Sequence, residues 1–230
     1  MGIVTSGIPS EITLELAKLN NAAVFVETGT FQGETTRWAA NHFDSVFTIE
    51  RGESIYRSQK GKLANLAGVK PLYGDSRKVL PSIVVEIGAR KAVFWLDGHW
   101  SGGETAGADD ECPLLGELAC LSGRTNDIVL IDDARLFLCA PPKPHKASEW
   151  PTISEIVDAL AQSHSRPFIQ VIDDVIFAIP NEAPLKSCLI NYAQERSNSF
   201  WQRYKNLQLE KSPGGGLKKF FSAIRKRVTS

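Results

Sequence analysis

The sequence of 230 residues lacks several features that would each point to a class of protein. Its four cysteines (Cys112, Cys120, Cys139 and Cys188) are too widely spaced for a zinc knuckle or a disulfide framework. It has no apolar run of about eighteen residues and no basic segment followed by an apolar core at its start, which predicts a cytoplasmic protein. Its 26 basic and 26 acidic residues balance, so the basic excess of a general nucleic-acid binder is missing.

Segments of strand character alternate with segments of helix character, and this alternation is typical of a sheet covered on both faces. The last two strand-like runs, within residues 167–180, are joined at Asp173 and Asp174, too closely for a crossover helix, so they must be antiparallel. The sequence thus predicts one α/β domain over residues 1–212. The expected fold is a doubly wound, Rossmann-like, seven-stranded sheet with a terminal antiparallel hairpin. The other predicted strands are 22–27, 45–50, 69–73, 91–97 and 128–132, and the predicted helices are 9–19, 33–43, 54–66, 77–87, 112–121 and 152–162.

Aspartates end two of the predicted strands. The segment FWLDGHW places Asp97 after the fourth strand, and LIDDA places Asp132 and Asp133 after the fifth. The ends of parallel strands meet at one edge of the sheet, so we expect the three carboxylates to converge there. Like charges so close together raise one another's pKa or recruit a cation, and a hard divalent ion suits oxygen donors. Each aspartate could alternatively cap a helix or close a turn.

The segment VFVETGTFQG reads as a strand, a glycine-bearing turn and the start of a helix. Gly29 would let the backbone approach a ligand, and Gly33 would let the helix pack closely. Phe31 replaces the middle glycine of the dinucleotide fingerprint, which argues against a pyrophosphate. Glu50, at the end of the second strand, could accept both ribose hydroxyls, and Asp75, at the end of the third, could contact an adenine amino group or cap a helix. Together these acids favour an adenosine-type ligand without phosphates.

Across residues 22–180 the chain resembles the class I S-adenosyl-L-methionine (SAM)-dependent methyltransferases. Within that class, FWLDGHW with LIDDA resembles the metal-dependent macrocin-type sugar O-methyltransferases. The resemblance implies SAM as cofactor, with the methionine part beside Glu27 and Gly29, the ribose at Glu50 and the adenine near Asp75 and Ser76. It also implies magnesium (Mg²⁺) held by the aspartates after the fourth and fifth strands. The predicted cofactor residues are Glu27, Thr28, Gly29, Gly33, Glu50, Asp75 and Ser76, and the predicted metal ligands are Asp97, Asp132 and Asp133.

The predicted catalytic residues are Asp97 and His99. A metal would favour the alkoxide of a hydroxyl acceptor and fix its oxygen, and His99 stands close enough to take the proton. Glu104 or Asp109 could replace His99 as the base or serve as a further metal ligand, and His99 could instead be an ordinary loop histidine. Two long loops, residues 98–111 and 135–151, follow the strands that carry these acids, and loops of that length at strand ends are usually functional.

The predicted reaction is methyl transfer to a sugar hydroxyl of a glycoside or of a surface polysaccharide precursor. The partner is then a small-molecule or glycan acceptor, with no nucleic acid and with a homo-oligomer as an option. Alternatives are a catechol-like O-methyltransferase, an NAD-type oxidoreductase or epimerase, and an inactive scaffold. In the tail, residues 213–230, apolar residues recur at helical spacing among five cations, which predicts peripheral contact with an anionic membrane at its inner face or a docked terminal helix.

Overall fold

A computed structural model of the chain describes residues 7–100, 102, 107–139, 141–163 and 166–211, with only the backbone described for residues 209–211. The predicted tail (213–230) and Glu104 lie outside the described residues. The described strands are β1 (Val24–Thr28), β2 (Ser45–Glu50), β3 (Val69–Tyr73), β4 (Ala92–Leu96), β5 (Ile128–Ile131), β6 (Phe168–Ile172) and β7 (Val175–Ile179).

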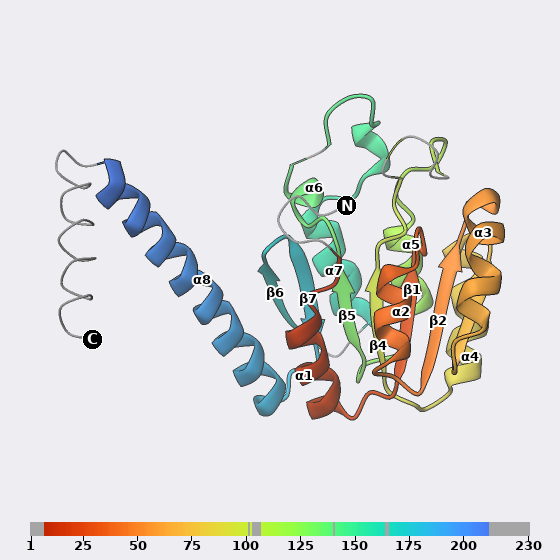
Figure 1. Cartoon of the computed structure of the whole chain (residues 1–230). Coiled ribbons are helices and arrows are strands. Elements are labelled where there is room, and N and C mark those ends of the chain that lie inside the picture. Colours follow the sequence, from red (N-terminus) through yellow and green to blue (C-terminus); the bar gives the residue numbers. More distant parts are fainter. Residues whose placement is uncertain (1–6, 101, 103–106, 140, 164–165, 212–230) are drawn as a thin grey trace, which may run out of the picture. The chain divides into compact units, whose positions relative to one another are not determined.

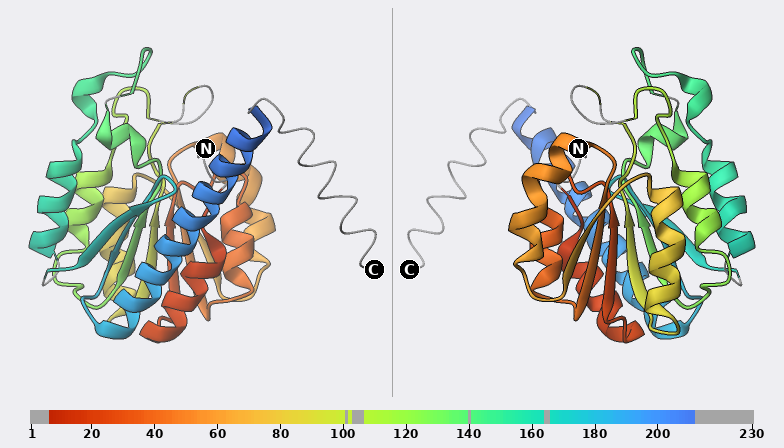
Figure 2. Two further views of the ribbon diagram at one scale, coloured as in Figure 1. Left: turned by 90° about the vertical axis from the view of Figure 1, so that its left-hand side faces the viewer. Right: turned by 90° about the vertical axis from the view of Figure 1, so that its right-hand side faces the viewer.

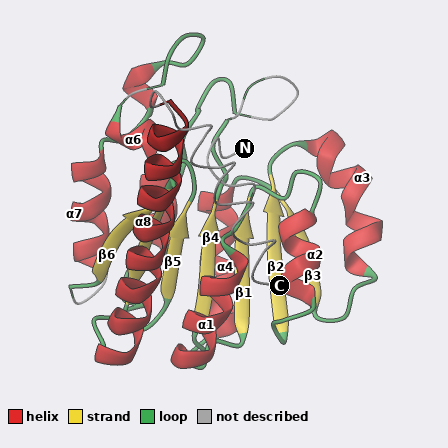
Figure 3. Cartoon of the chain, turned by 60° about the vertical axis from the view of Figure 1, so that its left-hand side comes forward, coloured by secondary structure: helices red, strands yellow, loops and turns green. Residues whose placement is uncertain are grey.

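The seven strands form one sheet in the order β3-β2-β1-β4-β5-β7-β6. Strands β1 to β5 pair in parallel, and β7 is antiparallel to both β5 and β6. The predicted fold class and its terminal hairpin are therefore confirmed. Thr28 lies opposite both Ile49 and Leu96, so the ends of β1, β2 and β4 are level at one edge of the sheet (Figure 3). This edge receives the predicted site residues.

Helices cover both faces of the sheet (Figures 1 and 2). On one face lie α1 (Ser10–Asn20), α2 (Glu34–Ala40) and α3 (Glu53–Ala64), and on the other lie α4 (Ser76–Ile87), α5 (Leu114–Cys120) and α7 (Ile153–Ser163). Every residue of β1, β4, β5 and β7 is buried. Their sequences are apolar runs rather than alternating patterns because both faces are covered.

Three helical elements were not predicted. α6 (Arg135–Leu138) and the 3₁₀ turn η1 (Ala147–Glu149) lie inside the second long loop, and α8 (Ala183–Lys211) follows the hairpin. The chain divides within α8 into two compact units, residues 1–188 and 189–230. The first unit contains the whole sheet, and the predicted domain boundary after residue 212 stays a prediction. No helix among the described residues is both long and apolar enough to cross a bilayer.

Candidate active site

A cavity of about 650 Å³ opens at the edge where the parallel strands end. Its volume lies within the range of small-molecule sites, roughly 300–1,000 Å³. The structure brings nine of the predicted site residues to its wall, whereas Thr28, Asp109 and Asp133 are not part of the lining. The nine are Glu27, Gly29, Gly33, Glu50, Asp75, Ser76, Asp97, His99 and Asp132.

The turn after β1 depends on two glycines with positive φ. Gly29 has φ +84°, and a Cβ there would lie 2.3 Å from the carbonyl oxygen of Asp97. Gly29 therefore lets the end of β1 approach the end of β4, in addition to lining the cavity. Gly33 has φ +73°, and a Cβ there would meet Leu63 of α3 at 3.1 Å. The close packing predicted for Gly33 is thus packing against α3.

The carboxylate of Glu50 is fixed by two backbone donors. Phe31 N–H donates to Oε2 (3.0 Å) and Gly52 N–H donates to Oε1 (2.6 Å). Phe31 can donate because its backbone turns through φ +44°, and its side chain stays half exposed beside the cavity. Each Glu50 oxygen has a second lone pair, so the carboxylate can also accept from a ligand.

Glu27 is buried beneath the turn and accepts two hydroxyl hydrogen bonds, from Thr36 Oγ1 (2.5 Å) and Thr48 Oγ1 (2.6 Å). Burial raises the pKa of Glu27 to about 8, and the two threonine hydrogen bonds only partly oppose this rise. At neutral pH the group is therefore mostly protonated. It can then donate a hydrogen bond of its own into the cavity.

Asp75 caps helix α4, which is the alternative role that its position allowed. It accepts from Arg77 N–H (3.0 Å) and from the guanidinium Nε (2.9 Å) and Nη2 (2.6 Å). These side-chain hydrogen bonds lower the pKa of Asp75. Arg77 also bonds the carboxylate of Asp110, which lies 3.6 Å from Arg51 Nη1. The two arginines thus anchor the first long loop to the ends of β2 and β3.

The acids after β4 and β5 meet around His99. His99 Nε2 lies 2.8 Å from Asp133 Oδ2, and His99 Nδ1 lies 3.7 Å from Asp97 Oδ1. Arg135 Nη1 donates to Asp133 Oδ1 (2.7 Å) and also bonds Asp174 in the hairpin turn. Asp133 has φ +57°, so the two adjacent acids turn apart: Asp132 lines the cavity, and Asp133 faces His99 and Arg135.

Charge is unevenly neutralised in this group. Burial raises the pKa of Asp97 to about 6, and burial together with the charges of Asp97 and Asp133 raises the pKa of Asp132 to about 7. For Asp133, burial would raise the pKa, but the bonds and charge of His99 and Arg135 outweigh it and lower the pKa. For His99, burial would lower the pKa, but the hydrogen bond to Asp133 and the nearby carboxylates raise it.

These contacts test the predicted magnesium site. Asp97 and Asp132 offer hard oxygen donors to the cavity, which suits a divalent ion, although Asp97 also lies 3.7 Å from His99 Nδ1. Asp133, the third predicted ligand, is held by His99 and Arg135 instead. Among the residues that the structure describes, no group of three or more His, Cys, Asp or Glu is arranged to hold a metal. The residues therefore fit the predicted magnesium site only in part.

Glu117 of α5 is a buried acid that the sequence did not single out. Glu117 is 1% exposed, its Oε1 has no hydrogen-bond partner among the described residues, and a Cβ on Gly98 would lie 3.0 Å from that oxygen. Burial raises its pKa to about 7, and the nearby Ser76 and Thr28 only partly oppose this rise. Glu117 therefore supports the cavity wall from behind. Nothing in the segment LLGELAC distinguishes it from a surface glutamate of an ordinary helix.

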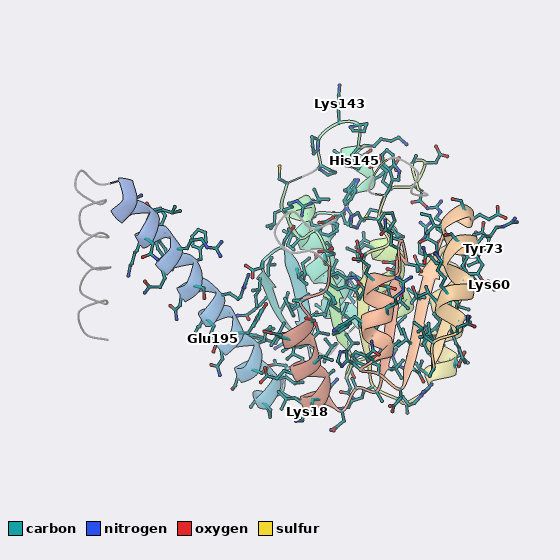
Figure 4. All side chains as sticks on the ribbon, in the orientation of Figure 1. Lys18, Lys60, Tyr73, Lys143, His145 and Glu195 are labelled. Carbon is teal, nitrogen blue, oxygen red and sulfur yellow. The ribbon has the colours of Figure 1, made fainter. Side chains whose placement is uncertain are left out.

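Glu111 joins the two long loops. Its buried carboxylate lies within hydrogen-bond distance of Trp150 Nε1 (2.7 Å), Lys146 N (3.0 Å) and His145 Nδ1 (3.1 Å). His145 stands on the second loop, beyond the strand ends (Figure 4). The Trp150 ring also lies 5.3 Å from the ring of His99. The two loops are therefore joined beside the catalytic candidates, and their functional role stays a prediction.

Comparisons with known proteins identify the fold. No family model matches the chain, and no curated protein matches it in sequence. The O-methyltransferase TomG from Streptomyces achromogenes, solved with SAM, aligns with a TM-score of 0.51 and 21% identity over 78% of this chain and 82% of TomG. The chain has a class I methyltransferase fold.

Two further solved structures support this result. A Staphylococcus aureus protein assigned as a caffeoyl-CoA O-methyltransferase aligns with a TM-score of 0.52 and 16% identity, over 76% of this chain and 86% of that one. A Klebsiella pneumoniae protein assigned as an O-methyltransferase aligns with a TM-score of 0.50 and 16% identity, over 77% of this chain and 83% of that one. At these identities the likeness concerns the fold, and the chemistry of this chain must be argued from its own residues.

Proposed function

We propose that the protein is a SAM-dependent O-methyltransferase that acts on a sugar hydroxyl of a glycoside or a surface polysaccharide precursor. The observation that carries the proposal is the position of Glu50. Its carboxylate is held by two backbone donors at the wall of a cavity at the strand ends, where this fold binds its nucleoside. The cavity wall also carries several acidic side chains, among them Asp97 and Asp132, which suit a ligand with a positive charge.

When bound, SAM would supply an electrophilic methyl group on a sulfonium. Glu50 would accept hydrogen bonds from the ribose hydroxyls, and Glu27 would lie beside the methionine part. In its neutral form, with Nε2–H donating to Asp133, His99 would take the proton of the acceptor hydroxyl at Nδ1 as the acceptor oxygen forms the new bond to carbon and the sulfur–carbon bond breaks. Asp133 would stabilise the imidazolium that results, because its bonds to His99 and Arg135 lower its pKa and keep it ionised.

The experiment is calorimetry of SAM binding to the wild type and to Glu50→Gln. The substitution keeps the shape of the side chain but removes its charge, and charged hydrogen bonds contribute roughly 1.5–3 kcal/mol, so the Kd should rise at least tenfold. Glu53→Gln is the matched control, because Glu53 is an exposed acid near Glu50 that pairs with Arg57. Equal affinity of wild type and Glu50→Gln would refute the assignment of the ribose contact.

The proposal includes a divalent metal ion that binds the acceptor hydroxyl. Asp97 and Asp132 support it as two donors that face the cavity, and Asp133 would have to release Arg135 or His99 to join them. Methyl transfer should stop in excess chelator and return with Mg²⁺, and Asp132→Asn should weaken metal dependence while sparing SAM affinity. If turnover is unchanged in excess chelator, methyl transfer does not need a metal, and Asp97 and Asp132 contribute only their charge.

A small aromatic acceptor is the second candidate. The rings of Trp100, His145 and Trp150 lie together next to His99, and an aromatic acceptor could stack in such surroundings. TomG is described as involved in tomaymycin synthesis, and the Staphylococcus aureus protein is assigned as a caffeoyl-CoA O-methyltransferase. Competition between simple glycosides and catechols in a methyl-transfer assay would distinguish the two acceptor classes.

A further inference from the structure

The distal part of α8 exposes four large apolar side chains. Phe200 is 64% exposed, Trp201 55%, Tyr204 46% and Leu207 49%. Their rings touch one another along the helix, with ring centroids 6.3 Å apart for Phe200 and Trp201 and 5.9 Å apart for Trp201 and Tyr204. This part of α8 belongs to the second compact unit, whose described residues are one helix. A lone helix has no core in which to bury these rings.

The four residues occupy one side of the helix. At about 100° per residue, Phe200, Tyr204 and Leu207 follow one another along a single stripe, and Trp201 widens it. We name these four residues the aromatic stripe. Arg203 and Lys205 fall at its two margins, and the opposite side carries the uncharged Gln202 and Asn206. Rings flanked by long cationic side chains suit the boundary between lipid headgroups and acyl chains.

The charge of this unit indicates the chemistry of its partner. Residues 189–230 contain nine basic and two acidic residues, an excess of seven positive charges. The whole chain is neutral, so residues 1–188 carry the opposite excess. Pairing the stripes of two copies would bring the positive charges together, which disfavours a dimer through α8. An anionic surface that also accepts exposed rings matches both properties.

We propose that the aromatic stripe of α8 lies on an anionic lipid bilayer. The rings would enter the headgroup region, and Arg203 and Lys205 would meet the lipid phosphates. The helix would lie on the membrane rather than cross it, in keeping with its many polar residues. This contact does not depend on methyl transfer.

The test is sedimentation of the full chain with vesicles of phosphatidylcholine alone or mixed with phosphatidylglycerol. Wild type should pellet with the mixed vesicles, less so at high salt, and only weakly with phosphatidylcholine. Trp201→Ser with Tyr204→Ser should reduce binding at least tenfold, and Lys205→Gln should reduce it roughly fivefold. The matched control, Gln202→Ser with Asn206→Ser on the opposite side, should bind like wild type.

Three results would overturn the proposal: equal binding of the stripe variant and wild type, no binding of wild type to the mixed vesicles, or a dimer in light scattering that the stripe variant dissociates. Preference for a DNA duplex over vesicles would likewise assign the cations to nucleic acid. Because all substituted residues are exposed, each variant should keep the wild-type thermal midpoint. This measurement separates lost binding from lost folding.

Discussion

Gly29 offers a direct test of how the site is built, because Gly123 provides a control with the same backbone angle. Both residues have φ +84°, but a Cβ on Gly29 would lie 2.3 Å from the Asp97 carbonyl oxygen, whereas a Cβ on Gly123 would meet nothing within 4 Å. A side chain at such a φ costs about 1–2 kcal/mol at either position. Gly29→Ala must also displace the end of β4, and overpacking of this kind costs about 1–3 kcal/mol more.

We therefore expect Gly29→Ala to lower the free energy of unfolding by about 2–5 kcal/mol and Gly123→Ala by about 1–2 kcal/mol. Urea titration followed by circular dichroism measures both. Gly29→Ala should also weaken SAM binding, since the displaced segment carries Asp97 and Gly98 into the cavity wall. If the two variants prove equally stable, the close approach of β1 and β4 does not limit this turn, and our account of Gly29 is wrong.

Three further substitutions test the buried charges. Burial raises the pKa of Glu117 from 4.5 to about 7, so its protonated form stabilises the fold fully below pH 4.5 and this stabilisation is lost as the pH rises to about 7. Glu117→Gln should therefore reduce the fall in the free energy of unfolding between these pH values by up to about 3 kcal/mol, as measured by denaturant titrations. If the pH dependence of the free energy of unfolding is unchanged in the variant, Glu117 is not buried as described. His99→Gln should lower kcat by roughly 10²–10⁴ with the Kd for SAM nearly constant, whereas a matching loss of affinity would make His99 a binding residue. Arg135→Gln should destabilise the fold by about 1–2 kcal/mol in thermal unfolding, because it leaves Asp133 with one partner fewer, and an unchanged midpoint would mean that solvent replaces the arginine.

Most of the sheet and its helices could be predicted because a doubly covered parallel sheet has a plain signature in the sequence. Five apolar runs end at polar residues, and each lies between helix-like segments, so every predicted helix appears within three residues of its predicted bounds. The hairpin was predictable from the two residues between its runs. α6 was not, because its four residues hold too little periodicity to indicate a helix.

The position of a site residue could be predicted where the end of a strand places it at the cavity. It could not be predicted where it depends on which partner the side chain bonds. Glu50 and Asp132 line the cavity because their strands end there. Asp133 does not, because its left-handed backbone and Arg135 turn it away, and spacing alone carries no sign of either. Thr28 ends β1 but faces inward, where its hydroxyl accepts from Asp97 N–H (3.2 Å).

The buried carboxyls of the cavity have a consequence for how it would treat a ligand before and after reaction. Glu27, Asp97 and Asp132, with pKa values raised to about 8, 6 and 7, hold a variable share of protons near neutrality. A cationic ligand favours their ionised forms and so binds with release of protons. Once a sulfonium has lost its methyl group it is a neutral thioether, and the carboxyls would recover those protons and hold the product less tightly. A wall of this kind discriminates between substrate and product by charge, although the two have nearly the same shape.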